Sequence, residues 1–154
     1  MDHMTIVDSP IGPLTLSADE DGLTGLHMGT LDVEDAVSTD RFGDAIEQLD
    51  SYWRGERRAF DLRLSPKGTP FQERVWKALT AIPYGTTISY GELARRVGNP
   101  RAVRAVGRAN GRNPIAVIVP CHRVIGADGT LTGFGGGLDR KRTLLALEGL
   151  QIDR

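Results

Sequence analysis

The 154-residue sequence changes character at Ser65-Pro66-Lys67-Gly68, and this break limits the possible folds more than any other feature. Before it, short apolar segments alternate with turns that contain Pro, Gly and Asp, which is typical of an antiparallel sheet. After it, apolar segments open on Thr or Ser residues that can cap a helix. We therefore expect an α+β protein with two lobes, residues 1–68 and residues 69–154.

The N-terminal lobe is predicted to be a short antiparallel meander followed by one helix. The expected strands lie at residues 6–7, 14–16 and 23–28, with turns at 9–13 and 19–22. Four large apolar residues recur at helical spacing before Gly55, namely Phe42, Ile46, Leu49 and Trp53. The acidic residues 30–40 are predicted to form a loop. No group of side chains in this lobe suggests catalysis.

The C-terminal lobe is predicted to begin with a capped helix. Thr69 can cap it, Pro70 suits its first position, and Gln72 completes a capping box. Its apolar stripe consists of Phe71, Val75, Leu79 and Ile82. The sequence Pro83-Tyr84-Gly85 is expected to end the helix.

Two short helices are predicted to follow. Ser89 and Glu92 have the spacing of a second capping box, and the helix that they open stops at Gly98. The sequence Asn99-Pro100 is expected to open the next helix at once. Two short helices joined by such a tight turn predict a helix-turn-helix.

The last predicted helix runs roughly over residues 138–148 and packs through Leu144, Leu145 and Leu147, with Gly149 as its stop. Glu148 lies in its final turn, where a carboxylate meets the negative end of the helix dipole. A locally unfavourable charge suggests a partner for Glu148. The alternative is an exposed glutamate that the helix tolerates.

The charges are divided unequally between the lobes. Residues 1–68 carry 14 acidic and 6 basic residues, a net charge of −8, and residues 69–154 carry 6 acidic and 13 basic residues, a net charge of +7. In the second helix of the helix-turn-helix, one face carries Arg101, Arg104, Ala105 and Arg108, and Val103 and Val106 point elsewhere. Such a face is typical of a protein that binds a phosphate backbone, although a solvated helix surface would have the same pattern.

The only cysteine, Cys121, is followed directly by His122. A thiol beside a base is a candidate nucleophile, because the thiolate is the attacking species. The alternative is a buried small apolar residue, since Cys121 follows a run of apolar residues. Pro120 interrupts any strand there, and the glycines that become frequent after Ile125 would let backbone approach a ligand.

Several classes of protein are excluded by composition. One cysteine allows no intramolecular disulfide and no cysteine-rich zinc site, and three histidines make a histidine metal site improbable. We expect neither a metal nor a cofactor. The sequence has no apolar run that could span a membrane and no signal-peptide pattern at its start, so we expect a cytoplasmic protein that does not bind membranes.

These residues together resemble the O6-alkylguanine-DNA alkyltransferase family, also called methylated-DNA–protein-cysteine methyltransferases. The resemblance extends from about Phe71 to Gly149 and is most specific at Pro120-Cys121-His122-Arg123-Val124. Further matching segments are Phe71–Trp76, Pro83-Tyr84-Gly85, Ile88-Ser89-Tyr90, Ala105-Val106-Gly107, Asn113-Pro114 and the glycine-rich turn before Lys141. The N-terminal lobe matches mainly through residues 8–14.

The resemblance implies a fold and an activity. The N-terminal lobe would be ribonuclease-H-like, and the C-terminal lobe would be a mostly helical, winged helix-turn-helix. The protein would be a suicide methylated-DNA–[protein]-cysteine S-methyltransferase that repairs DNA by direct reversal. It would move the alkyl group of O6-alkylguanine, and also of O4-alkylthymine, irreversibly to Cys121.

The same resemblance implies roles for individual residues. Adjacent residues in extended backbone point to opposite sides, so His122 would reach Cys121 through a water and shift the thiol toward thiolate. Glu148 would hold the His122 tautomer, Tyr90 would donate a proton to the departing guanine, and Asn113 would tie the recognition helix to the active-site segment. The substrate pocket would be formed by Val124, Phe134, Gly135 and Gly136. Phe134 stands where many relatives carry tyrosine, and the zinc-binding cysteines of some relatives are absent.

The implied partner is double-stranded DNA, bound through the minor groove and largely independently of sequence. The damaged nucleotide would flip out of the duplex, and Arg104 would fill the space that it leaves. Arg101, Ala102, Ala105 and Gly107 would lie against the DNA, where small residues permit close approach. The protein would be a monomer in solution that can bind DNA cooperatively.

Two other functions stay open from the sequence. The first is a helix-turn-helix damage sensor that binds DNA without chemistry, and transfer to Cys121 would separate it from an alkyltransferase. The second is a Cys-His-Glu hydrolase of small esters or amides, which would turn over more than once. A hydrolase gives no reason for three arginines on one helix face.

Overall fold

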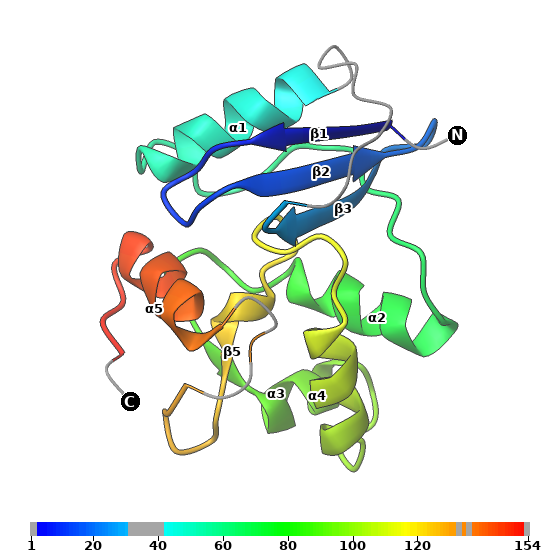
Figure 1. The fold of residues 1–154 in the computed structure, drawn as a ribbon. Coiled ribbons are helices and arrows are strands. Elements are labelled where there is room, and N and C mark those ends of the chain that lie inside the picture. Colours follow the sequence, from blue (N-terminus) through cyan, green and yellow to red (C-terminus); the bar gives the residue numbers. More distant parts are fainter. Residues whose placement is uncertain (1–2, 31–41, 132–133, 135–136, 153–154) are drawn as a thin grey trace. The chain divides into compact units, whose positions relative to one another are not determined.

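The computed structural model describes residues 3–30, 42–131, 134 and 137–152. The chain forms two compact units (Figure 1). Unit 1 comprises residues 1–67 and 114–116, and unit 2 comprises residues 68–113 and 117–154. The predicted acidic loop at residues 30–40 falls almost entirely outside the described residues.

Unit 1 contains the predicted antiparallel meander. Its strands are β1 (His3–Val7), β2 (Leu14–Ala18) and β3 (Leu23–Met28), in the order β1-β2-β3. Leu14 and Leu16 are fully buried, and Thr15 between them is buried as well, so both faces of the central strand are covered. The pairing shifts between Ser17 and Ala18, shortly before the turn into β3.

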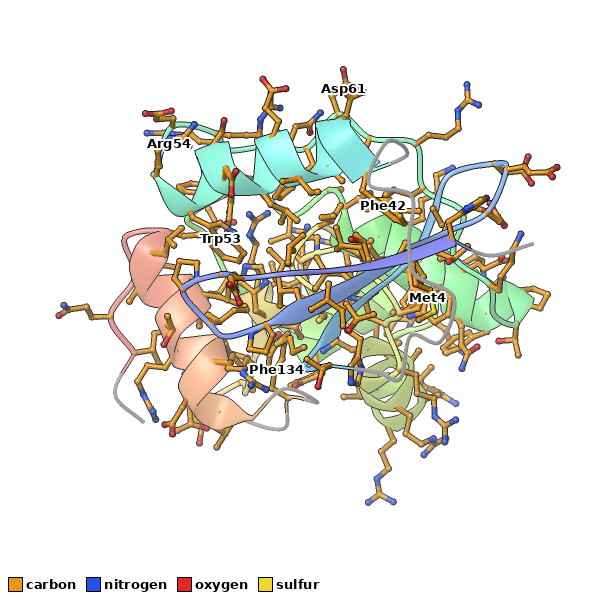
Figure 2. The ribbon with its side chains drawn as sticks, turned by 45° about the horizontal axis from the view of Figure 1, so that its top comes forward. Met4, Phe42, Trp53, Arg54, Asp61 and Phe134 are labelled. Atoms are coloured by element: carbon orange, nitrogen blue, oxygen red, sulfur yellow. The ribbon has the colours of Figure 1, made fainter. Side chains whose placement is uncertain are left out.

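Helix α1 (Gly43–Trp53) runs beside this sheet, and Figure 2 shows Phe42 and Trp53 at its two ends. The helix was predicted, but its buried stripe is different from the expected one. Its buried residues are Phe42, Ala45, Leu49 and Tyr52, whereas Ile46 and Trp53 are half-buried. The stripe is rotated because the small Ala45 and the large Tyr52 face the core, an arrangement that the spacing of large residues alone did not indicate.

The segment that precedes the change of character at residues 65–68 is bonded to β3. The Leu23 N–H donates to the Arg63 carbonyl at 2.9 Å, and the Ser65 N–H donates to the Leu23 carbonyl at 2.7 Å. On the same strand, the Leu26 N–H donates to the Pro114 carbonyl at 2.8 Å. This bond brings residues 114–116 into unit 1, although they lie far along the chain.

Unit 2 begins with α2 (Pro70–Leu79), whose capping box is confirmed. The Gln72 N–H donates to the Thr69 hydroxyl at 3.1 Å, and the Thr69 N–H donates to the Gln72 side-chain carbonyl at 3.0 Å. The helix ends at Leu79, before the predicted stop at Pro83. Its buried residues are Val75, Trp76 and Leu79, and Phe71 is only half-buried.

The helix-turn-helix consists of α3 (Tyr90–Arg96) and α4 (Val103–Gly111). Ser89 caps α3 as predicted, and Gly98 follows it with a φ of +87°. The second helix begins at Val103 and not at Pro100, because residues 99–102 form a separate turn closed by an Ala102 N–H to Asn99 carbonyl bond. Arg101 therefore precedes the helix, and Val103 is exposed, whereas Val106 is fully buried.

The remaining elements of unit 2 surround the segment that carries the cysteine. A short parallel pair joins β4 (Ile88–Ser89) to β5 (Val124–Ile125), and the sequence did not predict it. Helix α5 (Leu138–Leu147) buries Leu144 and Leu145 as expected, with Leu147 half-buried. The predicted α+β class is confirmed. Within the described residues, no helix is long and apolar enough to cross a membrane.

Candidate active site

Cys121, His122 and Arg123 form one 3-10 turn, η2 (Cys121–Arg123), directly after Pro120. The sequence predicted extended backbone here, and that prediction is wrong. The Arg123 N–H bonds to the Pro120 carbonyl at 3.0 Å, which closes the turn, and all three side chains are buried. Val117 precedes it with a φ of +72°, a conformation that costs a β-branched residue about 1–3 kcal/mol.

Burial controls the state of the Cys121 thiol. It raises the pKa of Cys121, while a hydrogen bond from the Asn113 side chain and the positive charge of Lys141 act in the opposite direction. The sequence predicted a shift toward thiolate, so the free protein differs from that expectation, because desolvation outweighs the favourable groups. The thiol is held protonated and needs a base when it reacts.

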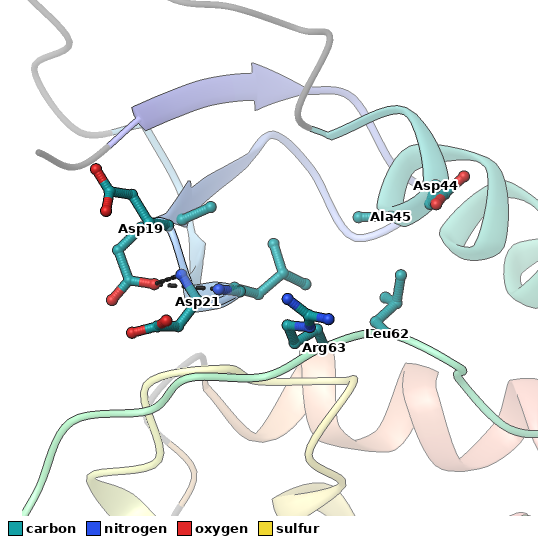
Figure 3. Close-up of a pocket in the computed structure, with 10 residues that line it drawn as sticks. Asp19, Asp21, Asp44, Ala45, Leu62 and Arg63 are labelled. Carbon is teal, nitrogen blue, oxygen red and sulfur yellow. Dashed lines mark hydrogen bonds between the residues drawn. The ribbon is translucent and has the colours of Figure 1, made fainter.

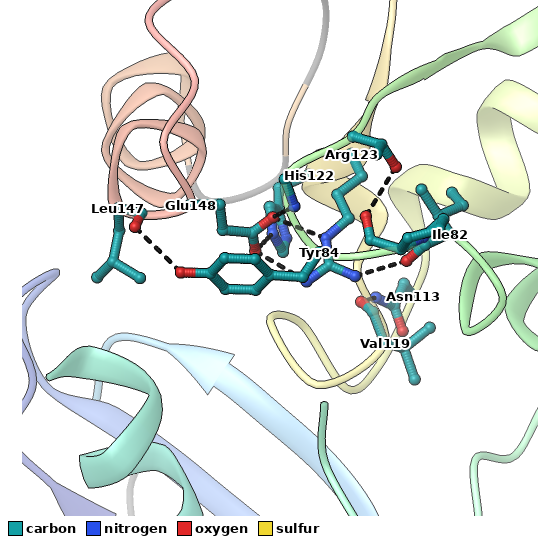
Figure 4. A network of polar contacts seen from close by, with 11 residues as sticks. Ile82, Tyr84, Asn113, Val119, His122, Arg123, Leu147 and Glu148 are labelled. Carbon is teal, nitrogen blue, oxygen red and sulfur yellow. Dashed lines mark hydrogen bonds and ion pairs between the residues drawn. The ribbon is translucent and has the colours of Figure 1, made fainter. Parts of the chain in front are cut away.

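His122 belongs to a buried polar network with Glu148 and Arg123 (Figure 4). The His122 Nε2 atom lies 2.7 Å from Glu148 Oε2. Arg123 donates from Nε to Glu148 Oε1 at 2.8 Å and from Nη2 to Oε2 at 2.9 Å. The side chains of His122 and Glu148 are 0% exposed, so water does not screen these contacts.

Burial keeps His122 neutral, and the contact with Glu148 fixes its tautomer. Burial lowers the pKa of His122; Glu148 raises it, and the charges of Arg123 and Lys141 lower it further. A carboxylate can only accept, so the neutral ring carries its hydrogen on Nε2. The other ring nitrogen, Nδ1, is buried and has no hydrogen-bond partner among the residues that the structure describes. His122 therefore presents a free acceptor inside the unit.

Glu148 caps the C-terminal end of α5 and is 5% exposed, so the alternative of an exposed, tolerated glutamate is wrong. Besides His122 and Arg123, its Oε1 atom accepts the Gly85 N–H at 3.2 Å. These donors offset the unfavourable end of the helix dipole. Glu148 thus has the partner that its position suggested, His122. It also has a second one, the cation Arg123, which the sequence analysis did not assign.

Lys141 is a second charged residue to which the sequence analysis gave no role. It is 0% exposed, and its Nζ donates to the Val124 carbonyl at 2.7 Å. Burial lowers its pKa to about 8, and Cys121 counteracts that shift. Because Lys141 stands among polar and basic neighbours on the helix, its sequence context is typical of a surface residue. The sequence alone therefore gave no signal that the Lys141 side chain is buried.

Two asparagines, one in the last turn of α4 and one shortly after the helix, hold the segment that leads to the cysteine. Asn113 Nδ2 donates to the Val119 carbonyl at 2.8 Å, and Asn110 Nδ2 lies 3.4 Å from the Cys121 carbonyl. The Oδ1 atom of Asn110 is buried without a partner among the described residues. The tie that the resemblance implied for Asn113 is present, and Asn110 is an additional contact that the sequence analysis missed.

The other residues expected in the pocket are placed as follows. Tyr90 is the first residue of α3, is half-buried, and lies next to Gly107, where an added Cβ would come within 3.7 Å of its ring. Val124 is fully buried in β5, and its carbonyl already accepts from Lys141. Phe134 is half-buried, whereas Gly135 and Gly136 lie outside the described residues.

The exposed side of the helix-turn-helix is basic. Arg101, Arg104 and Arg108 are exposed, and Ala102 and Ala105 between them are half-buried. Beside them, a hollow of about 240 Å³ lies between α2 and α4 and is lined by Thr69, Phe71, Gln72, Ala105, Arg108, Ala109 and Arg112. Small side chains flanked by arginines can contact a phosphate backbone closely.

Unit 1 has a cavity of similar size, about 240 Å³, at the turn between β2 and β3 (Figure 3). Its polar lining is mainly acidic and includes Asp19, Asp21 and Asp44, with Arg63 opposite. The Asp19 carboxylate is occupied by the N–H groups of Asp21 and Gly22 and by Lys67. The residues that line this cavity include no Cys, Ser, Thr or Lys that could act as a nucleophile. No cluster of three or more metal-binding side chains occurs among the described residues.

The neutral His122 predicts how stability depends on pH. The unfolded chain takes up a proton at His122 near pH 6.5, whereas burial keeps the folded chain unprotonated below that value. The free energy of unfolding should therefore fall as the pH decreases below about 6.5, by up to about 1.4 kcal/mol per pH unit for this one group. Urea unfolding at several pH values measures the slope. His27→Gln, at an exposed position, should leave the slope unchanged, and an equally flat wild-type curve would contradict the prediction.

Both halves of the chain match models of one protein family. The model described as "6-O-methylguanine DNA methyltransferase, ribonuclease-like domain" matches residues 3–66, and the one described as "6-O-methylguanine DNA methyltransferase, DNA binding domain" matches residues 70–150. The chain therefore belongs to the 6-O-methylguanine DNA methyltransferase family. The resemblance that the sequence predicted is confirmed.

Individual relatives agree over nearly the whole chain. A methylated-DNA–protein-cysteine methyltransferase of Mycobacterium tuberculosis is 55% identical, covering 96% of this chain and 93% of the relative. One from Methanosarcina acetivorans is 52% identical, covering 96% of this chain and 98% of the relative. A crystal structure of the M. tuberculosis protein OGT in complex with DNA superposes with a TM-score of 0.89 at 55% identity, covering 95% of this chain and 92% of the other.

Proposed function

We propose that this protein repairs DNA by transferring the alkyl group of O6-alkylguanine to Cys121. The observation that carries the proposal is a buried thiol directly beside a neutral histidine that Glu148 holds, within a helix-turn-helix unit. Relatives at 52–55% identity carry the name of this activity. The product is a stable thioether, so each molecule acts once.

Proton transfer from the thiol is the first requirement of this reaction. Cys121 is held as a thiol, and the buried Nδ1 of His122 is an acceptor without a partner among the described residues. We assign Nδ1 as the base, acting through a bridging water, while Nε2–H stays on Glu148. The thiolate then attacks the alkyl carbon, and the bond between that carbon and O6 breaks. Asn113 and Lys141 stabilise the thiolate as it forms.

The departing guanine needs a proton, and we assign its donor as Tyr90. Tyr90→Phe removes the hydroxyl and keeps the ring against Gly107, so DNA affinity should be retained. The single-turnover rate should fall by about one to two orders of magnitude, which is the lower range for loss of a general acid. Rapid-quench kinetics at saturating protein measure it. An unchanged rate would remove Tyr90 from this role.

The proposed partner is double-stranded DNA, and binding through the basic face of α4 supports a largely sequence-independent contact. The proposal includes docking of α4 in the minor groove and flipping of the damaged nucleotide. It also includes a monomer in solution that binds cooperatively along DNA, and a cytoplasmic location. We further propose that the protein repairs O4-alkylthymine and that its two domains divide between residues 68 and 69. In the pocket, Val124, Phe134, Gly135 and Gly136 are proposed to contact the base.

Intact-protein mass after incubation with a duplex that contains one O6-methylguanine tests the function. We expect one added methyl group per wild-type molecule, located at Cys121 by peptide mapping, and none on Cys121→Ser. Tight binding without an adduct would indicate a damage sensor instead. Turnover of a small ester or amide beyond one equivalent would indicate a hydrolase.

A further inference from the structure

The Arg123 side chain makes several buried contacts, although it takes no part in the reaction steps described above. Besides its two bonds to Glu148, its Nη1 donates to the Ile82 carbonyl at 2.7 Å. Its guanidinium carbon lies 5.7 Å from the centre of the Tyr84 ring, and Tyr84 is itself held by a bond from its hydroxyl to the Leu147 carbonyl. Only 7% of the side chain is exposed. Two segments, residues 82–84 and the C-terminal end of α5, therefore fix the guanidinium against one carboxylate.

This placement decides the charge of the buried cluster. With Arg123 positive, Glu148 negative and His122 neutral, the three side chains have no net charge. Without Arg123, a neutral His122 would leave the buried Glu148 carboxylate without its counter-charge, which is costly. The cluster would lower that cost by binding a proton, and His122 is the base that the carboxylate contacts. The other groups near His122 are the thiol of Cys121 and the cation of Lys141. Neither can replace the two N–H groups of Arg123 that donate to the Glu148 carboxylate.

We propose that Arg123 is a positioning residue for alkyl transfer: its two-point contact with Glu148 neutralises the carboxylate and so keeps Nδ1 of His122 free to accept the Cys121 proton. Arg123 touches neither the thiol nor the substrate in this role. The inference rests on the proposed function, since it explains how the base stays available at neutral pH. A lysine could supply the charge but not the two parallel bonds.

The first test follows the His122 ring itself and needs no DNA. Replacing His3 and His27 by Gln leaves His122 as the only histidine, so its two ¹⁵N signals report tautomer and protonation directly. In this background, Arg123→Met should raise the pKa of His122 by about one to three pH units, the range expected for one nearby charge. Arg123→Lys should restore the original value only in part, because lysine supplies the charge without the two parallel bonds. An unchanged His122 pKa in Arg123→Met would overturn the proposal.

The second test is the pH profile of methyl transfer from a duplex with one O6-methylguanine. If His122 becomes protonated at neutral pH in Arg123→Met, the rate there should fall about tenfold or more and recover as the pH rises. Arg123→Lys should lie between that variant and the wild type. An equal loss at every pH would indicate a purely structural role and would overturn the proposal.

Arg142→Met is the matched control. Arg142 forms a partly exposed ion pair with Asp139 on α5, so its loss removes one arginine without touching the cluster. It should change neither the His122 signals nor the pH profile. If Arg123→Met does not fold, Arg123→Lys carries the test, and a His122 pKa equal to that of the wild type would overturn the role of the two-point contact. If the wild type transfers no methyl group, the proposed function fails, while the ¹⁵N measurement still decides the role of Arg123.

Discussion

Glu148→Ala should destabilise the protein by about 3–5 kcal/mol and lower its melting temperature by about 10 °C. The reason is that one substitution leaves the buried Arg123 guanidinium without its carboxylate and removes the acceptor of His122 Nε2–H. Because the His122 tautomer is then no longer fixed, the rate of methyl transfer should fall by about two orders of magnitude or more. Thermal unfolding and single-turnover kinetics measure the two effects.

Two further variants separate burial from pairing. Glu148→Gln keeps the shape and one acceptor oxygen, so it should lose less stability than Glu148→Ala, yet it should still transfer slowly. Glu92→Ala removes another carboxylate that pairs with two basic side chains, here Arg95 and Arg96, but the Glu92 side chain is 36% exposed. Its loss of stability should be much smaller, because water screens exposed pairs. Equal losses at Glu148 and Glu92 would show that the buried network does not contribute as argued.

Arg104→Ala should slow repair in duplex DNA by roughly 5- to 30-fold while leaving the reaction with free O6-methylguanine almost unchanged. Flipping a nucleotide out of a duplex costs a few kcal/mol, and a side chain that fills the vacated space recovers part of it. Loss of about 1–2 kcal/mol of that recovery gives this range of rates. Arg104 is exposed on α4, as such a role requires. Single-turnover rates at saturating protein on both substrates provide the comparison.

Arg108→Ala is the control for this comparison. Arg108 lies one turn further along α4 and is also exposed, so it should contribute to phosphate contact without entering the base stack. This variant should bind DNA more weakly and with a smaller dependence on salt, but at saturation it should repair duplex DNA at nearly the wild-type rate. If Arg104→Ala slowed both substrates equally, the intercalating role of Arg104 would be refuted.

Elements with strong local signals were predicted well. The three strands, the capping box at Thr69 and the stop of α3 at Gly98 all follow from nearest neighbours in the chain. The start of α4 was predicted wrongly, because a Pro at the start of a helix and a Pro in a preceding turn look alike in sequence. The stripe of α1 was wrong for a related reason, since hydrophobic size does not indicate which way a helix is rotated.

The sequence by itself determined the α+β class, the basic helix-turn-helix and the pairing of one cysteine with one histidine, since these depend on periodicity, composition and adjacency. Only the tertiary structure decided how that pair is set for chemistry. Cys121, His122 and Glu148 meet Arg123 and Lys141 in one buried cluster, although these residues are separated by up to 27 positions in the chain. Burial there raises the pKa of the thiol and lowers that of the imidazole. Desolvation depends on everything packed around a group, so no local pattern could have predicted it.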